Sequence, residues 1–386
     1  MILETFVPTI YKDGLGRVTS PPFDMITKAM EKELKKNPYN IVNLKDCKDP
    51  EEARKLFNTW QEKGVISKNN NQGFVVLKQV FVEGGIQRER YGVIGIINLK
   101  EPENCLIPHE SVITKLVNQR EKLIERMEYQ TEPVFVVSEQ AKLNETLRSV
   151  MSEKNCERIY EEPEGVYNSI CILSDPVKIG RIQEVLKGDI GIIADGHHRT
   201  KAMLSLSKKY GGDIQFFNHL FVFVTSLRSE SIFIAQVHRI VDYDEVTMEM
   251  IREKFNLVKT NESVDLRYPV VIHGETKYLL DPKTEMKYGD YLDIIDRSIK
   301  KGSGRAGIKY TYIKEEAEKE IRDDPIKMTF MMPPWDKGAF VKTMKKGYVL
   351  PAKSTYFYPK IPSGIAFYGL DAQECRCGLV GRAADS

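Results

Sequence analysis

IGIIADGHHRT, residues Ile190–Thr200, is the stretch that decides the fold of this chain. It begins with an apolar run that is typical of a buried strand. An Asp-Gly pair follows, and this pair predicts a turn. His-His-Arg comes next, at the head of a predicted helix over 200–210. The sequence therefore predicts a strand, a tight turn and a helix with basic side chains in its first turn.

The start of this predicted helix has the chemistry of an anion site. Backbone N–H groups and the positive end of the helix dipole favour negative charge there. Gly196 allows close approach of the backbone, and further donors come from His197, His198 and Arg199. Without an anion these cations would oppose the dipole. Asp195 could hold Mg²⁺ or orient a histidine. The alternative is an Asp-Gly turn before a solvated basic helix, and the two adjacent imidazoles favour the functional interpretation.

Two further segments carry candidate site residues. Pro108-His109-Glu110 places a histidine beside a carboxylate just before a helix predicted over 111–129. An acid there is also common dipole compensation. Within 350–360, Lys353-Ser354-Thr355 combines a point charge with two hydroxyls. Such a group suits a phosphate or a carboxylate, although it also fits an ordinary strand edge.

The rest of the chain alternates between strand and helix patterns. Together they predict an α/β protein with a mixed sheet, with α+β as the alternative. Gly302–Gly307 fits G-x-G-x-x-G, but a predicted helix over 291–301 precedes it, and the dinucleotide fingerprint must follow a strand. Strands are expected at 73–83, 91–99, 133–137, 169–173, 190–194, 220–224 and 232–241, and further helices at 23–37, 50–63, 246–255 and 315–322.

Composition excludes several classes of protein. The 386 residues suggest two or three domains at roughly 150 residues each, and 57 Lys and Arg against 55 Asp and Glu give a net charge of +2. A near-neutral chain does not bind nucleic acid or anionic membrane through bulk charge. Neither a signal peptide nor a membrane-spanning apolar run is visible. We therefore expect a cytoplasmic protein with neither nucleic acid nor membrane as partner.

The three segments resemble the active-site segments of archaeal free-serine kinases, and they occur in the same order along the chain. Those kinases are enzymes of the ParB/sulfiredoxin superfamily. The whole chain is also similar to a larger, mostly uncharacterised bacterial and archaeal family related to them. This resemblance implies a ParB/sulfiredoxin-like α/β core with additional N- and C-terminal regions. The expected regions are an N-terminal α/β region at 1–100, a catalytic core at 101–225, a C-terminal region with the Lys-Ser-Thr segment at 226–370, and a flexible tail at 371–386.

The resemblance also implies an activity. A phosphotransferase of this kind would move a phosphoryl group from ADP or ATP, with Mg²⁺, to the hydroxyl of free serine. Its partners would be a nucleotide and a small hydroxy amino acid. The implied catalytic residues are Glu110 as base, His109 and Asp195, with Asp195 also a candidate Mg²⁺ ligand. The implied nucleotide and phosphate site is Gly196, His197, His198, Arg199 and Thr200, and the implied substrate or phosphate clamp is Lys353, Ser354 and Thr355.

A second function stays open on the same residues. It is a ParB-like regulatory module that binds or hydrolyses a nucleotide without a metabolite acceptor. The comparison within the superfamily argues against the functions of two other relatives. Sulfiredoxin chemistry needs a cysteine where this chain has His197, and a DNA-binding ParB role needs a recognition helix and a basic surface.

Overall fold

The computed structural model describes residues 1–22, 25–47, 49–102, 104–152, 158–161, 165–260, 267–302 and 307–370. By contact, the chain divides into two compact units. The first contains Met1–Ile107, Val112–Ile232 and the residues from Pro359 onward, and the second contains Pro108–Ser111 and Phe233–Tyr358. Regions 1–100 and 101–225 of the sequence prediction thus lie mostly in the first unit. The predicted tail at 371–386 and most of the Gly302–Gly307 stretch lie outside the described residues.

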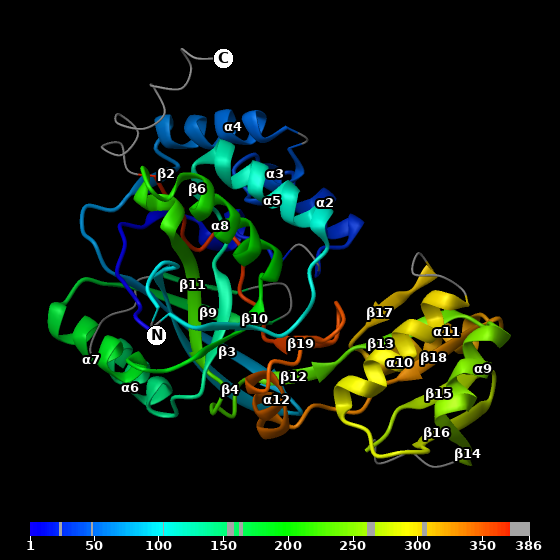
Figure 1. The fold of residues 1–386 in the computed structure, drawn as a ribbon. Coiled ribbons are helices and arrows are strands. Elements are labelled where there is room, and N and C mark those ends of the chain that lie inside the picture. The colour runs from blue at the N-terminus through cyan, green and yellow to red at the C-terminus, as the bar shows by residue number, and fades with distance from the viewer. Residues whose placement is uncertain are drawn as a thin grey trace. The chain divides into compact units, whose positions relative to one another are not determined.

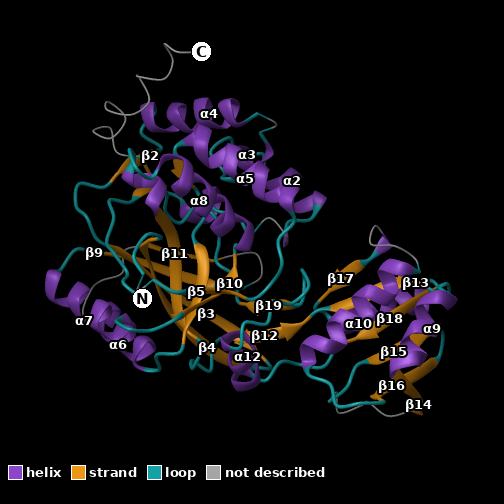
Figure 2. Ribbon diagram, in the orientation of Figure 1, coloured by secondary structure: helices purple, strands orange, loops and turns teal. Residues whose placement is uncertain are grey.

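An eight-stranded mixed sheet forms the centre of the first unit (Figure 2). β7 and β11 run parallel, whereas the other pairs with a described register are antiparallel. The strands expected at 73–83 and 91–99 are present as β3 and β4, which form a hairpin with Gly84-Gly85 at its turn. The α/β class with a mixed sheet is therefore confirmed. In spatial order the strands are β5 (Leu106–Pro108), β10 (Gly191–Asp195), β7 (Val134–Ser138), β11 (His219–Ser226), β4 (Ile86–Asn98), β3 (Phe74–Glu83), β9 (Tyr167–Leu173) and β8 (Arg158–Glu161).

One continuous apolar cluster joins this sheet to four helices. Alternate residues of the strands, such as Val76, Val93 and Val222, pack against side chains of α5, α6, α7 and α8. Figure 1 shows α5 and α8 side by side. Asp175 caps α7 by accepting from two backbone N–H groups, and Pro176 follows at the first helical position. The helices of this unit are α1 (Leu15–Val18), α2 (Lys28–Leu34), α3 (Val42–Asp46), α4 (Pro50–Glu62), α5 (Thr114–Met127), α6 (Lys142–Ser152), α7 (Pro176–Leu186) and α8 (His197–Tyr210).

Two small sheets complete the first unit. β1 (Thr9–Tyr11) pairs with β2 (Ile66–Lys68), and β6 (Tyr129–Gln130) pairs with β20 (Tyr368–Gly369). A short 3₁₀ helix, η2 (Gln215–Asn218), leads into β11. Among the described residues, no helix is long and apolar enough to cross a lipid bilayer.

The second unit is built on a six-stranded antiparallel sheet. One face packs on α11 through residues such as Ile240, Ile272 and Ile321. Separately, β12 (Phe233–Gln236) pairs with β19 (Thr355–Tyr358). The order in the large sheet is β14 (Phe255–Thr260), β16 (Thr276–Pro282), β15 (Val270–His273), β18 (Lys327–Met331), β13 (His238–Asp242) and β17 (Lys309–Thr311), and the helices are α9 (Glu245–Lys254), α10 (Tyr288–Lys301), α11 (Lys314–Asp323) and α12 (Lys337–Lys345).

Several element boundaries differ from the sequence prediction. The strand expected over 232–241 is two strands, β12 and β13, which belong to different sheets. The helix expected over 23–37 begins only at Lys28, where Thr27 accepts from the N–H of Met30 as the N-cap. A cap of this kind fixes the helix start more sharply than apolar spacing does.

His238 gives the second unit a pH-dependent stability. Its side chain is fully buried, and Nδ1 accepts a hydrogen bond from the N–H of Met332 at 3.1 Å. Burial, together with the charges of Arg239 and Lys314, lowers the pKa of His238 from 6.5 to about 4. Between these pH values the unfolded chain binds a proton that the folded chain does not. This contribution to stability is therefore full above pH 6.5 and is lost as the pH falls toward 4.

Replacing His238 by Asn should remove that dependence. The Asn oxygen can still accept from the Met332 N–H but does not titrate. Between pH 6.5 and pH 4 the wild type should lose about 3 kcal/mol more free energy of unfolding than His238→Asn. Urea unfolding at a series of pH values measures this difference. Parallel stability curves for the two proteins would contradict the assignment.

Candidate functional site

The predicted strand, turn and helix are present as β10, Gly196 and α8. Gly196 is the N-cap of α8 and has φ 98°, a left-handed conformation that favours glycine. A Cβ on this residue would lie 3.0 Å from Nη2 of Arg199 and 3.1 Å from a methyl carbon of Val134. The first turn of a helix directs its N–H groups beyond the helix end. This turn is therefore a place where an anion is stabilised by the helix dipole.

Asp195 holds two cations at the start of α8. Its Oδ2 lies 2.9 Å from Nη2 of Arg199, and its Oδ1 lies 3.1 Å from Nζ of Lys360. Burial raises the pKa of Asp195, but the charges of Lys360 and Arg199 outweigh it and hold this pKa well below its usual range. The side chain is 38% exposed, so solvent screens part of this effect. Asp195 thus remains a carboxylate throughout the physiological pH range.

Arg199 is fixed on both edges of its guanidinium group. Nη1 donates to the carbonyl of Pro133 at 2.8 Å and lies 3.7 Å from the Glu132 carboxylate. Ser363 in turn donates to Glu132 at 2.5 Å. The arginine of the motif therefore points across the strand end with a defined orientation.

Lys360 contacts Asp195, although the sequence prediction of the site does not include it. It ends the Lys353–Lys360 segment, and its side chain is only 8% exposed. Two buried polar side chains, Gln79 and Arg90, hold the backbone at Lys360 in place. The Gln79 amide donates to the carbonyl of Lys360 at 3.1 Å, and Arg90 donates to the carbonyl of Pro359 at 2.5 Å. Arg90 is itself fully buried and hydrogen-bonded to Gln79. No local pattern in the sequence indicates that Lys360 meets Asp195.

The two histidines of the motif have different surroundings. His197 is buried, and its charge adds to the cations that lower the pKa of Asp195. His198 accepts a hydrogen bond at Nε2 from the N–H of Ile113 at 3.0 Å, so this nitrogen carries no proton in the arrangement. Ile113 is the N-cap of α5. The starts of α5 and α8 therefore meet at His198.

In the second unit, Glu110 and the Lys353–Thr355 segment come together. The Glu110 carboxylate accepts from the N–H of Lys353 at 3.0 Å, of Ser354 at 2.9 Å and of Thr355 at 3.0 Å. The Thr355 hydroxyl lies 3.2 Å from the same carboxylate and 2.6 Å from Nε2 of His109. His109 is fully buried, and its Nε2 lies 3.4 Å from Glu110. Two of the three motifs of the sequence thus form one contact network.

Asp195, the candidate Mg²⁺ ligand, does not fit a Mg²⁺ site in this arrangement. Both oxygens of the Asp195 carboxylate face cationic nitrogens of Arg199 and Lys360. Across the part of the chain that the structure describes, no group of three or more His, Cys, Asp or Glu side chains has metal-binding geometry. Mg²⁺ often binds through few carboxylates and takes its remaining ligands from substrate phosphates and water.

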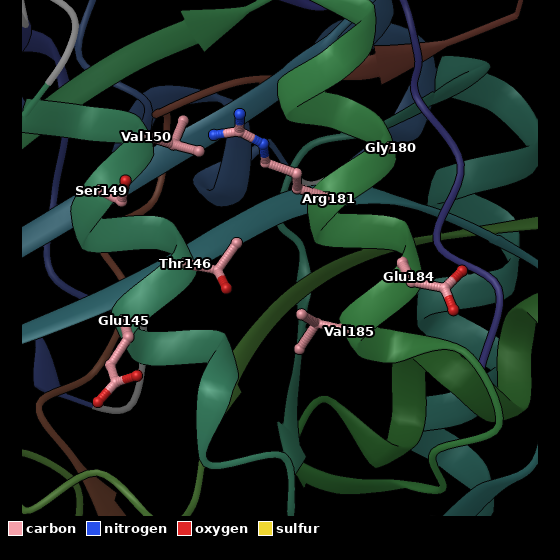
Figure 3. A pocket seen from close by; sticks show the side chains of 8 residues that line it. All are labelled: Glu145, Thr146, Ser149, Val150, Gly180, Arg181, Glu184 and Val185. Carbon is pink, nitrogen blue, oxygen red and sulfur yellow. The ribbon is translucent and has the colours of Figure 1, made fainter.

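A groove lies between α6 and α7, away from these motifs in the sequence (Figure 3). Its volume is about 620 Å³. In Figure 3 the side chains of Glu145 and Arg181 come from the two opposite helices. None of the site residues expected from the sequence lines it. The full lining is Glu145, Thr146, Ser149, Val150, Gly180, Arg181, Glu184 and Val185.

Comparison with known proteins gives a family and several solved structures of low similarity. A mutant free serine kinase in complex with ADP is 13% identical with a TM-score of 0.46, covering 73% of this chain and 93% of that chain. SbnI with a C-terminal truncation, from Staphylococcus aureus, is 14% identical with a TM-score of 0.45, covering 73% and 92%. A conserved hypothetical protein from Pyrococcus furiosus is 14% identical with a TM-score of 0.42, covering 71% and 94%.

No curated protein matches the chain. The family described as "Protein of unknown function (DUF1015)" matches residues 7–301, which is more than half of the sequence. The chain therefore belongs to the DUF1015 family.

Proposed function

We propose that this protein is a phosphotransferase that transfers the terminal phosphoryl group of ADP or ATP to the hydroxyl of free serine. The observation that carries the proposal is the start of α8. Lys360 and Arg199 gather there on Asp195, beside a glycine-capped first turn. Phosphoryl transfer chiefly needs positive charge and N–H donors around the transferring group. The arrangement supports the phosphate-binding role that the sequence resemblance implies for Gly196 through Thr200.

The proposed reaction moves one proton, forms one bond and breaks another. The serine oxygen bonds to the terminal phosphorus, and the bond from that phosphorus to the bridging oxygen breaks, which leaves AMP from ADP or ADP from ATP. Glu110 is the proposed acceptor of the hydroxyl proton, with His109 beside it. Lys353, Ser354 and Thr355 are proposed to bind the substrate or its phosphate. These roles follow the resemblance of the motifs.

A second candidate function is the nucleotide-binding regulatory module without a metabolite acceptor. The hydrogen bonds on Glu110 favour it, since a carboxylate that accepts several N–H donors is a weaker base. The two functions differ in what serine does to nucleotide turnover. A kinase consumes ADP or ATP faster when serine is present, whereas a regulatory module hydrolyses it slowly whether or not serine is added.

Measurement of nucleotide consumption with and without serine therefore separates the two. The proposal predicts turnover that depends on serine and saturates with it. Slow turnover unaffected by serine would favour the regulatory module. If ADP and ATP are neither consumed nor able to shift the thermal unfolding of the protein, both functions are wrong.

Lys360→Met should weaken nucleotide binding by roughly tenfold to a hundredfold, the value of one charge-assisted hydrogen bond. The substitution removes a cation near the proposed phosphate position. It also leaves the negative charge of Asp195 balanced by Arg199 and no longer by Lys360. Isothermal titration calorimetry below the unfolding temperature measures the affinity. Lys201→Met is the matched control, because Lys201 is exposed on the same helix. An unchanged affinity in Lys360→Met would exclude Lys360 from the phosphate site.

A further inference from the structure

The carboxylate of Glu110 sits in a cradle of main-chain donors. Three consecutive N–H groups, those of Lys353, Ser354 and Thr355, point to it at 2.9 to 3.0 Å. The Thr355 hydroxyl lies 3.2 Å from the same group. Consecutive N–H groups that converge in this way form a concave anion-binding nest. Here the bound anion is a side chain of the protein itself.

The loop that forms this cradle is held in a specific shape. Lys353 has φ 64°, a left-handed conformation that a non-glycine residue adopts at a cost. Ser354 is fully buried and donates from its hydroxyl to the carbonyl of Pro351 at 2.6 Å. On the other side, Leu350 exchanges main-chain hydrogen bonds with His109 and Ser111. Both ends of the cradle are thus fixed, and its donors are arranged for an oxyanion before any ligand binds.

We propose that residues 353–355 are a binding site for a small oxyanion, a carboxylate or a phosphate group, and that Glu110 occupies this site as an internal substitute. An incoming oxyanion competes with Glu110 for the same N–H donors. Its binding releases Glu110 from three hydrogen bonds and makes that carboxylate more basic. The last consequence rests on the proposed function, in which Glu110 is the base. The competition for the donors does not depend on it.

Glu110→Ala in the full-length chain tests the proposal without nucleotide or serine. The truncated side chain vacates the cradle, so added acetate or inorganic phosphate should bind there and stabilise the variant. We expect the apparent affinity for at least one of these anions, measured from the rise of the unfolding temperature at constant ionic strength, to exceed that of the wild type at least tenfold. Chloride serves as the salt control. Stabilisation by acetate alone would identify a carboxylate as ligand, and stabilisation by phosphate alone a phosphate group.

Glu110→Gln is the matched control, because its amide oxygen still fills the cradle and no gain of anion binding is expected. Glu110→Asp is a second test variant that covers the case in which Glu110→Ala does not fold. Its shorter side chain reaches fewer of the three donors, so it should also be stabilised by the anions more than the wild type. The proposal is wrong if neither variant gains affinity. If the variants bind the oxyanion but the wild type forms no phosphoserine, only the proposed function is refuted.

Discussion

Glu110→Gln should abolish phosphoserine formation, with a loss of roughly 10²- to 10⁴-fold in kcat, the usual contribution of a general base. Glutamine has nearly the same shape as glutamate but cannot take up the hydroxyl proton. Its amide oxygen can still accept from the N–H groups of Ser354 and Thr355, so the loop should keep its conformation. The unfolding temperature should therefore stay unchanged, and the nucleotide affinity should stay within about twofold of the wild type. Initial-rate kinetics and calorimetry on the same preparations measure both.

A matched substitution separates this effect from a general loss of negative charge. Glu121→Gln makes the same chemical change on α5, outside the proposed site, and should leave kcat unchanged. If Glu110→Gln retains the activity of Glu121→Gln, Glu110 is not the base. If Glu110→Gln also loses nucleotide affinity, its role is to support the fold or the binding site instead.

Asp296→Ala should destabilise the second unit by about 3 to 5 kcal/mol, because it breaks a buried ion pair. Asp296 on α10 accepts from Nε of Arg239 at 2.9 Å, and the two side chains are 8% and 0% exposed. Arg239 also donates to the carbonyl of Val237, whereas its buried Nη2 has no partner among the described residues. Loss of Asp296 would leave a full charge uncompensated in the interior. Such a charge costs far more than a lost surface contact.

Asp293→Ala provides the control on the same helix. Asp293 pairs with Arg297 four residues on, and these side chains are 46% and 74% exposed. A pair of this kind contributes roughly 0.3 to 0.5 kcal/mol. The chain has two tryptophans, Trp60 in the first unit and Trp335 in the second. Urea unfolding in a Trp60→Phe background, followed by Trp335 fluorescence, therefore reports on the second unit. Equal midpoints for both variants would contradict the assigned importance of the buried pair.

Short-range features of the fold were predictable because the sequence encodes them locally. The Asp195-Gly196 turn needs a residue that tolerates positive φ, and glycine marks it. The hairpin of β3 and β4 has its turn residues between two β-branched runs. The break within the strand expected over 232–241 was not predictable in this way. Apolar residues continue through Val237, but the chain changes its partner strand there. Sequence pattern describes burial but does not say which strand lies alongside.

The contacts of the candidate site were not predictable in the same way. Lys360 and Asp195 are 165 residues apart, and no spacing rule connects them. Glu110 and Ser354 are 244 residues apart, and the donors that hold Glu110 are main-chain N–H groups. Main-chain donors are present at every residue except proline, so their convergence leaves no mark in the sequence. The motifs predict which residues carry the chemistry, and only the fold brings Lys360 to Asp195.

Direct detection of O-phosphoserine tests the proposed function most directly. The full-length protein is incubated with free serine, Mg²⁺ and ADP or ATP that carries ³²P in the terminal phosphoryl group, and the products are separated and identified by mass spectrometry. The proposed function predicts label in O-phosphoserine, formed in equal amount to the AMP or ADP released. Release of labelled inorganic phosphate with no label in serine would contradict it.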